Sequence, residues 1–309
     1  MRRVTSILSR LLVLGPALAL AGCGGGVLDP HGPIADSERK ILFDSLAIML
    51  ALIVPTLLGG AWVAWWFREG NPRAQYRPEF TFSGRIEILV WSVPTLIIVF
   101  LGGVIWFGAH QLDPYRPIAS KEKTLPVQVV SLDWKWLFIY PDQGVASVNE
   151  LVIPAGTPVR LEMTSSSVMN TFWVPQLAGM IYTMNGMVTQ LHLAADHPGE
   201  FEGRSGMFSG DHFAAMHFVV RSVAPDAFSQ WVDTAKASGP ALDRAAYDAL
   251  AKPAVPDHAS TYRSVDPALF DAITTQAIPA SSDPVNPQST DQQSSATPAS
   301  ATPASTAEK

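Results

Sequence analysis

The segment 201–218, FEGRSGMFSGDHFAAMHF, gathers side chains that bind metals or form hydrogen bonds, yet it contains no cysteine. Its hydroxyl, imidazole and thioether groups belong to Ser205, Ser209, His212, Met216 and His217. Serine hydroxyls are hard ligands that stay protonated at neutral pH, so they bind Cu(I) poorly. The chain's single cysteine, Cys23, lies close to the N-terminus. A type I blue-copper site, which is built around a cysteine, is therefore excluded in this segment.

Four histidines suggest a different metal site: His192, His197, His212 and His217. His197 lies in a turn beside Pro198, while His192 and His217 fall within predicted strands. Because a hydrogen-bonded histidine is ordinary in such places, we expect structural histidines rather than a metal site. We likewise expect core packing for Met180, Met184 and Met187.

The composition indicates a membrane protein with one extramembrane domain. The chain has 309 residues, of which 48% are hydrophobic, and its mean hydropathy of +0.17 is high for a soluble protein. The formal charge is −6, and the only concentration of basic residues is one short connector, which gives no sign of nucleic-acid binding. One cysteine leaves no possibility of an internal disulfide.

Residues 1–22 have the layout of a secretory signal peptide: arginines, an apolar run over residues 11–20, then small residues. The run ends in Leu-Ala-Gly-Cys at Cys23, the pattern of a bacterial lipobox. We therefore expect cleavage before Cys23, lipidation of its thiol, and a tether over residues 23–40. The alternative is an ordinary signal peptide with an incidental cysteine.

Two apolar stretches, 41–67 and 86–110, are each long enough to cross a hydrocarbon core of about 30 Å. They predict a transmembrane hairpin over residues 41–110. The connector between them carries two glutamates against four arginines: Arg68, Arg73, Arg77 and Arg85. This charge places the connector in the cytoplasm. The signal peptide independently places the N-terminus outside, so we expect everything after residue 110 in the periplasm.

Short apolar segments separated by turn residues predict an all-β sandwich or small barrel over residues 111–225. The expected strands are 127–134, 136–140, 149–153, 159–164, 171–174, 187–193, 200–204 and 215–222. Trp134 and Trp136 are expected to pack within these strands. Helical spacing over 226–251 and 266–275 predicts a C-terminal helical arm, residues 226–277. Residues 278–309, rich in Pro, Ser, Thr, Ala and Gln, are expected to be disordered.

A lipobox, two spans and a β-domain with the motif DWKW at 133–136 resemble subunit II of the haem-copper oxidases. The resemblance implies a Greek-key cupredoxin-like sandwich. Segment 167–175, SVMNTFWVP, is similar to the stretch that carries the first copper histidine, and 201–216 to the stretch with the other ligands. By this resemblance the copper-bearing branch has a histidine at Asn170, cysteines at Ser205 and Ser209, a ligating glutamate carbonyl at Met207 and a histidine at Phe213. Among the six positions, the match to a ligand type is at Met216.

This pattern resembles the quinol-oxidising branch, the cytochrome bo type, as do VVSLDWKWLFIYPDQGVASVNE and IYTMNGMVTQLHL. The resemblance implies a non-catalytic subunit, with structural and assembly roles, of a proton-pumping ubiquinol oxidase in a bacterial inner membrane. The complex would oxidise ubiquinol and reduce oxygen to water. No cofactor would be bound by this chain, because the haems and the remaining copper belong to the catalytic subunit I. Its partners would be that subunit, further oxidase subunits and membrane lipids.

Ubiquinol reaches the catalytic subunit through the bilayer, so a metal relay at the outer surface has no task. Because unpaired buried polar groups cost about 1–3 kcal/mol each, we expect Phe172, Met207 and Phe213 to fill the vacated copper space.

Glu87 opens the second span. The resemblance of RIEILVWSVP gives it a place beside a proton-uptake channel of the catalytic subunit. The alternative is a helix-initiating acid favoured by the macrodipole.

Two other functions stay open at this point. The first is an electron-transfer subunit of a cytochrome c oxidase with a rebuilt copper site. The second is a membrane lipoprotein that acts as a binding or assembly module.

Overall fold

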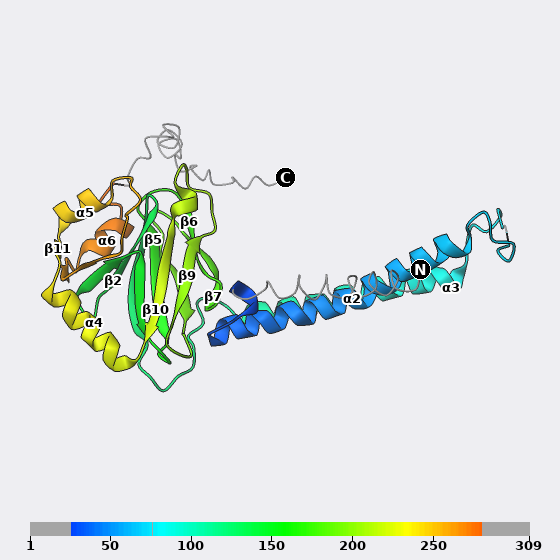
Figure 1. Ribbon diagram of the computed structural model, residues 1–309, viewed down its shortest axis with the longest axis horizontal. Helices are drawn as coiled ribbons and strands as arrows, with labels where there is room; N and C mark the ends of the chain where they lie inside the picture. The colour runs from blue at the N-terminus through cyan, green and yellow to red at the C-terminus, as the bar shows by residue number, and fades with distance from the viewer. Residues whose placement is uncertain (1–25, 76, 280–309) are drawn as a thin grey trace, which may run out of the picture.

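The computed structural model describes residues 26–75 and 77–279. Figure 1 shows a β-domain from which a pair of long helices projects as a stalk. The predicted signal peptide, Cys23 with its expected lipid, and the tail from residue 280 onward lie outside the described residues.

The stalk consists of α2 (Pro33–Trp66) and α3 (Gly84–Gln111), which are long and apolar enough to cross a membrane. A short 3-10 helix, η1 (Gly26–Leu28), precedes them. α2 begins well before the predicted residue 41, because Pro33 suits the first helical turn and Asp36 bonds Arg39 and Lys40 at 2.8 and 2.6 Å. The last part of the predicted tether is therefore helical.

The apolar side chains of the stalk point outward. Leu57 is 67% exposed and Trp91 is 71% exposed. Prolines lie inside both helices, at Pro55 and Pro94. Helices with apolar side chains exposed on their outer faces suit a hydrocarbon environment, in which backbone hydrogen bonds are satisfied within each helix.

The β-domain is a sandwich of two mixed sheets. The larger sheet has the order β12-β3-β2-β1-β5-β8 and the smaller has β4-β10-β9-β6-β7. Each contains one parallel pair, β1 with β5 and β10 with β4. The strands of the sandwich are β1 (Leu125–Leu132), β2 (Lys135–Tyr140), β3 (Val145–Val148), β4 (Glu150–Pro154), β5 (Val159–Ser165), β6 (Asn170–Val174), β7 (Ala178–Thr183), β8 (Thr189–Leu193), β9 (Gly199–Ser205), β10 (His217–Val223) and β12 (Ser260–Tyr262).

The sequence predicted most of these strands but missed β3, β7 and β12, the last a three-residue strand within the predicted helical arm. β3 is four residues long and follows a turn, so it offers little periodicity. β7 is the edge of the smaller sheet, and between its two buried ends its residues are exposed or only partly buried. Trp134 also differs from expectation, because it sits in the two-residue turn between β1 and β2 with a φ of 62°.

Strand β2 is buried along its whole length because both of its faces are covered. Trp136, Phe138 and Tyr140 belong to the core between the two sheets. Leu137 and Ile139 belong to a second cluster, formed with the C-terminal arm. The arm thus closes the outer face of the larger sheet, as Figure 1 shows for α5 and α6.

The arm comprises α4 (Pro225–Ala237), α5 (Arg244–Leu250) and α6 (Leu269–Thr274), with a small sheet of β11 (Ala241–Leu242) and β13 (Ser264–Val265). The helical segment predicted over 226–251 is broken at Gly239, whose φ of +96° and close approach to the Thr261 carbonyl require glycine. Ile278 is buried in the arm cluster, so the packed arm reaches the first residue of the predicted tail.

Lys135 connects β2 to the arm through two hydrogen bonds. Its ammonium donates to the carbonyls of Leu250 at 2.8 Å and Lys252 at 2.7 Å. These carbonyls follow the end of α5, where a cation is favourable. Burial lowers the pKa of Lys135, and the neighbouring Asp133 opposes that shift.

Candidate functional site

The six positions of the expected copper site meet at one end of the smaller sheet. Asn170 opens β6 and Ser205 closes β9, and these strands are paired so that Phe172 lies opposite Ser205. Met216 lies directly before β10, which pairs with the other side of β9. The sequence predicted that these segments belong together, and the fold brings them together.

Ser205 now makes hydrogen bonds where a thiolate would be needed. Its hydroxyl lies 3.2 Å from the side-chain oxygen of Asn170 and 3.2 Å from the carbonyl of Met207. A serine has one proton, so it donates to one of these acceptors at a time. The Asn170 amide nitrogen donates to the Val168 carbonyl at 3.3 Å. The Met207 carbonyl, the group that resemblance assigns to copper, is within reach of a hydroxyl instead.

We call the place where the six positions meet the pocket. Ser209 and Met216 form its other half, and both are buried. The Ser209 hydroxyl lies 3.8 Å from the Met216 sulfur. The Ser209 carbonyl accepts a hydrogen bond from the Trp134 indole N–H at 3.0 Å. This bond across the loop corrects the expectation that Trp134 packs within a strand, whereas Trp136 is fully buried in the core as expected.

The apolar filling of the pocket differs from the prediction. Phe172 is fully buried and stacks on Phe218, with ring centroids 4.9 Å apart. Met207 and Phe213, however, are only half-buried. Phe213 lies in the 3-10 helix η2 (Phe213–Ala215), and its ring faces Phe208, a side chain that is 75% exposed. Hydrogen bonds and the Met216 thioether therefore close the buried part of the pocket, a contribution that the sequence analysis did not foresee.

The donor set does not fit a dinuclear copper centre. Its side chains offer two hydroxyls, an amide and two thioethers, with neither a thiolate nor an imidazole at the six positions. Bridging thiolates are the soft ligands that such a centre needs. Within the described ranges 26–75 and 77–279, no group of three or more His, Cys, Asp or Glu side chains is arranged to hold a metal ion.

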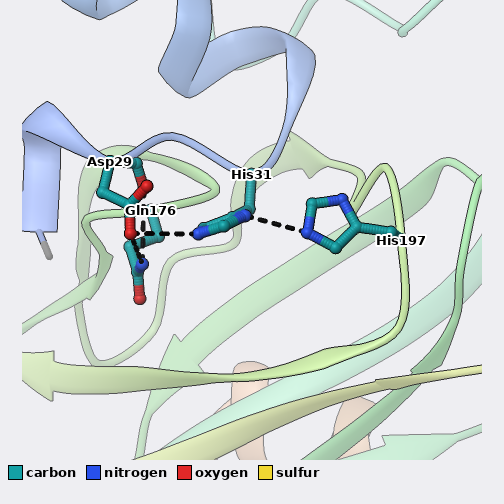
Figure 2. Close-up of polar contacts among 4 residues, drawn as sticks. All are labelled: Asp29, His31, Gln176 and His197. Atoms are coloured by element: carbon teal, nitrogen blue, oxygen red, sulfur yellow. Dashed lines mark hydrogen bonds and ion pairs between the residues drawn. The ribbon is translucent and has the colours of Figure 1, made fainter.

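The four histidines considered from sequence lie apart. His192 is buried and its ring nitrogen meets the Pro114 carbonyl at 3.0 Å. His212 lies edge-on to Trp134, with centroids 4.7 Å apart, and His217 is exposed. His197 instead pairs with His31, which comes from the segment before α2, and Figure 2 shows this contact. Sequence reasoning missed His31, because 166 residues separate the two histidines.

Glu87 lies in the first turn of α3, at the end of the stalk that carries the arginine-rich connector. Its carboxylate accepts a hydrogen bond from the Trp91 indole N–H at 3.2 Å. The position agrees with both interpretations of Glu87, a helix-initiating acid and a group beside a neighbouring subunit.

Exposed apolar side chains lie on the elements next to the pocket. Met180 and Tyr182 are exposed on the edge strand β7, Met187 is exposed in the loop before β8, and Phe208 is exposed in the loop after β9. The expectation of core packing was therefore wrong for Met180 and Met187, because they lie on an uncovered sheet edge and in a loop. The Met180 sulfur lies 3.9 Å from the point where Gly206 would carry a Cβ, which joins the β7 edge to the loop. We call these four side chains the apolar rim.

Comparisons with known proteins find similar families and chains. The family model of the cytochrome c oxidase subunit II periplasmic domain matches residues 142–223, and the model of the COX aromatic-rich motif matches residues 236–278. In solved structures, the periplasmic domain of subunit II of cytochrome oxidase from Bradyrhizobium japonicum is 27% identical. It has a TM-score of 0.36 and covers 38% of this chain and 97% of that one.

Two relatives match over most of their length. Ubiquinol oxidase subunit 2 of Acetobacter aceti is 43% identical over 270 residues, which are 87% of this chain and 88% of that protein. Cytochrome bo(3) ubiquinol oxidase subunit 2 of Pseudomonas aeruginosa is 43% identical over 265 residues, which are 86% and 80% of the two chains. The fold and the family expected from sequence are thus confirmed. This chain belongs to the subunit II family of the haem-copper oxidases, on the branch of the ubiquinol oxidase subunit 2 proteins.

Proposed function

We propose that this chain is the subunit II of a terminal ubiquinol oxidase and that it transfers no electrons itself. The complex oxidises ubiquinol and reduces oxygen to water, while this subunit has structural and assembly roles. The observation that carries the proposal is the hydrogen bonding of Ser205 to Asn170 and to the Met207 carbonyl. Each of these three residues occupies a copper position, and their polar groups satisfy one another.

The electron donor explains why such a change is tolerated. A soluble one-electron donor outside the membrane needs a metal relay near the outer surface, whereas ubiquinol dissolves in the bilayer. It can reach the catalytic subunit without passing through the β-domain. A pocket that kept its buried polar groups unpaired would cost about 1–3 kcal/mol for each group. The bonds of Ser205 and Ser209 avoid that cost.

The apolar rim supports a docking role. Met180, Tyr182, Met187 and Phe208 are large apolar side chains on a surface that also adjoins the stalk, since β7 contacts α2. A monomeric soluble domain seldom exposes such a group of side chains, and its presence marks an interaction surface. We assign this surface to the catalytic subunit I, which would hold the haems and the remaining copper.

The topology follows from the stalk. Both helices cross the inner membrane, the arginine-rich connector faces the cytoplasm, and the β-domain lies in the periplasm. Lipidation of Cys23 adds a second attachment to the inner membrane, on its periplasmic side. Mass spectrometry of the mature N-terminus checks this part of the proposal, because a chain that begins at an unmodified residue other than Cys23 contradicts it.

Glu87 is proposed to form one edge of the proton entrance of the catalytic subunit. Changing Glu87→Gln keeps the size of the side chain and its hydrogen bond to Trp91 but removes its charge. We expect slower oxygen consumption and proton uptake in the assembled oxidase, with Glu79→Gln in the connector as the matched control. Unchanged turnover in Glu87→Gln would leave only the helix-initiating role.

The main test is purification of the complex in a mild detergent, followed by haem and copper analysis and by assays with two electron donors. We expect co-purification with haem, copper only in the amount that subunit I requires, and activity with ubiquinol but not with reduced cytochrome c. Additional copper that stays with this chain would support the cytochrome c oxidase alternative. Separation of the chain from all haem proteins would support the free lipoprotein alternative.

A further inference from the structure

Two histidines that are distant in sequence converge where the segment before α2 crosses the β-domain. Figure 2 shows the side chains of Asp29, His31, Gln176 and His197 around this point. The Nδ1 atom of His31 lies 2.9 Å from the Nε2 atom of His197. The other nitrogen of His31, Nε2, lies 3.2 Å from the carboxylate of Asp29. Gln176 donates its amide N–H to the same carboxylate at 3.3 Å.

His31 is held rigidly by the backbone around it. Its N–H donates to the Gln176 carbonyl at 2.8 Å, and its carbonyl accepts from the Asp196 N–H at 2.9 Å. The His31 ring lies against Phe201, with centroids 5.2 Å apart. The next residue, Gly32, sits so close to the Ala194 carbonyl that a Cβ there would clash. One of the two imidazoles is therefore fixed in place before any ligand arrives.

The contact to Asp29 decides which nitrogen of His31 is free. A carboxylate accepts a hydrogen bond, so Nε2 of His31 carries the proton and Nδ1 offers a lone pair. That lone pair points toward Nε2 of His197. A neutral His197 can move its own proton to Nδ1, which leaves a second lone pair on Nε2 that faces the first across 2.9 Å. A carboxylate behind a histidine is the arrangement that orients histidine ligands in metal sites.

We propose that His31 and His197 bind a divalent transition-metal ion of the zinc class, with water completing its coordination. Zinc–nitrogen bonds of about 2.0–2.1 Å at a tetrahedral angle place two nitrogens roughly 3.3 Å apart. The pair at 2.9 Å must open by a few tenths of an ångström, and the His197 ring must tilt so that both lone pairs meet at the ion. The Asp196 N–H bonds the His31 carbonyl at 2.9 Å, so rotation of the His197 side chain supplies this change while the backbone stays in place. The sequence alone predicts no metal on this chain and gives no sign that these two residues meet.

The ion would join the segment that leads into the membrane anchor to the β-domain. His31 belongs to the two residues before α2, and His197 belongs to the turn between β8 and β9. Bound metal would thus fix the stalk to the sandwich at the point where α2 begins. The role is structural and separate from electron transfer, so it does not depend on the proposed function.

The test uses the full chain purified in detergent without a polyhistidine tag. Zinc affinity is measured by competition with a chromophoric chelator, and Co²⁺ serves as a spectroscopic probe. Either His31→Gln or His197→Gln should weaken zinc binding at least tenfold and remove the visible absorption of bound Co²⁺. Asp29→Asn should weaken binding by about 10–100-fold, as expected for a residue that orients a ligand.

His217→Gln, an exposed histidine on β10, is the matched control and should bind zinc as the wild type does. Urea midpoints without metal show whether each variant is folded, and added zinc should raise the midpoint of the wild type but not of the two histidine variants. Equal zinc affinity in the wild type, His31→Gln and His197→Gln would overturn the proposal. So would a loss of affinity in His217→Gln of the same size.

Discussion

The pocket at the six expected copper positions and the cluster around His31 are opposite cases of the same chemistry. The pocket keeps six positions at the meeting point of β6, β9 and β10, but Ser205 and Ser209 offer hydroxyls where thiolates would be needed. The cluster around His31 offers two imidazoles and an orienting carboxylate, but it is partly open to solvent. Strand pairing decides where side chains meet, and the identity of those side chains decides whether a metal can bind.

The two regions also differ in what they do for stability. Ser205 and Ser209 are buried, so their hydrogen bonds replace water that is no longer accessible. Asp29 and Gln176 keep access to water, so their hydrogen bonds can be exchanged for others. We therefore expect substitutions in the pocket to change the free energy of unfolding more than substitutions around His31.

The largest expected effect is a gain of copper binding. Combining Asn170→His, Ser205→Cys, Ser209→Cys and Phe213→His restores the ligands while the backbone stays in place. We expect a dinuclear copper centre, detected by metal analysis and by visible absorption from thiolate to copper. A variant with only the two histidine changes is the control, because it lacks the bridging sulfurs. A folded fourfold variant that binds no copper would show that the pocket has lost the geometry as well as the ligands.

The second effect is on the core beneath the pocket. Phe172→Ala removes a fully buried ring that stacks on Phe218, so it should lower the free energy of unfolding by about 3–5 kcal/mol. Phe208→Ala, in the exposed apolar rim, should change it by about 0.5 kcal/mol or less. Urea unfolding of the detergent-purified chain, followed by tryptophan fluorescence, measures both. Similar losses in the two variants would mean that the rim is part of the core.

The third effect compares the two regions directly. Ser205→Ala leaves the Asn170 side-chain oxygen and the Met207 carbonyl without this donor, so it should cost about 1–3 kcal/mol. Gln176→Ala removes a longer, more exposed hydrogen bond to Asp29 and should cost at most about 1 kcal/mol. The same urea experiment applies. A larger loss for Gln176→Ala would reverse the order of the two regions.

The smallest effect extends the contrast between buried and exposed groups to pH. Burial lowers the pKa of Lys135 from its ordinary value of 10.5. Between the lowered pKa and 10.5, the unfolded chain binds more protons than the folded chain, so the free energy of unfolding should rise with pH. In Lys135→Met this rise should disappear. Urea midpoints of wild type and variant at a series of alkaline pH values measure this difference. Parallel pH profiles of the two proteins would contradict the prediction.

Local sequence patterns predicted the large elements well. Two long apolar runs predicted α2 and α3, and short strands between turn residues predicted the sandwich. Elements that depend on distant partners were missed. β3 is too short to show a period and forms because β2 and β12 pair with it. Trp134 follows a strand pattern in sequence, but the tight turn between β1 and β2 requires it to adopt a positive φ.

The sequence by itself determined which chemistry is missing from the copper positions, because the side chain at each position is a matter of composition and not of folding. It also determined that two segments need an apolar solvent. Only the tertiary structure decided how the pocket at these positions is closed, that Met207 and Phe213 stay half-buried, and that His31 meets His197. Contacts of this kind arise when the sheets and the segment before α2 pack together, and they join residues whose separation along the chain leaves no local pattern.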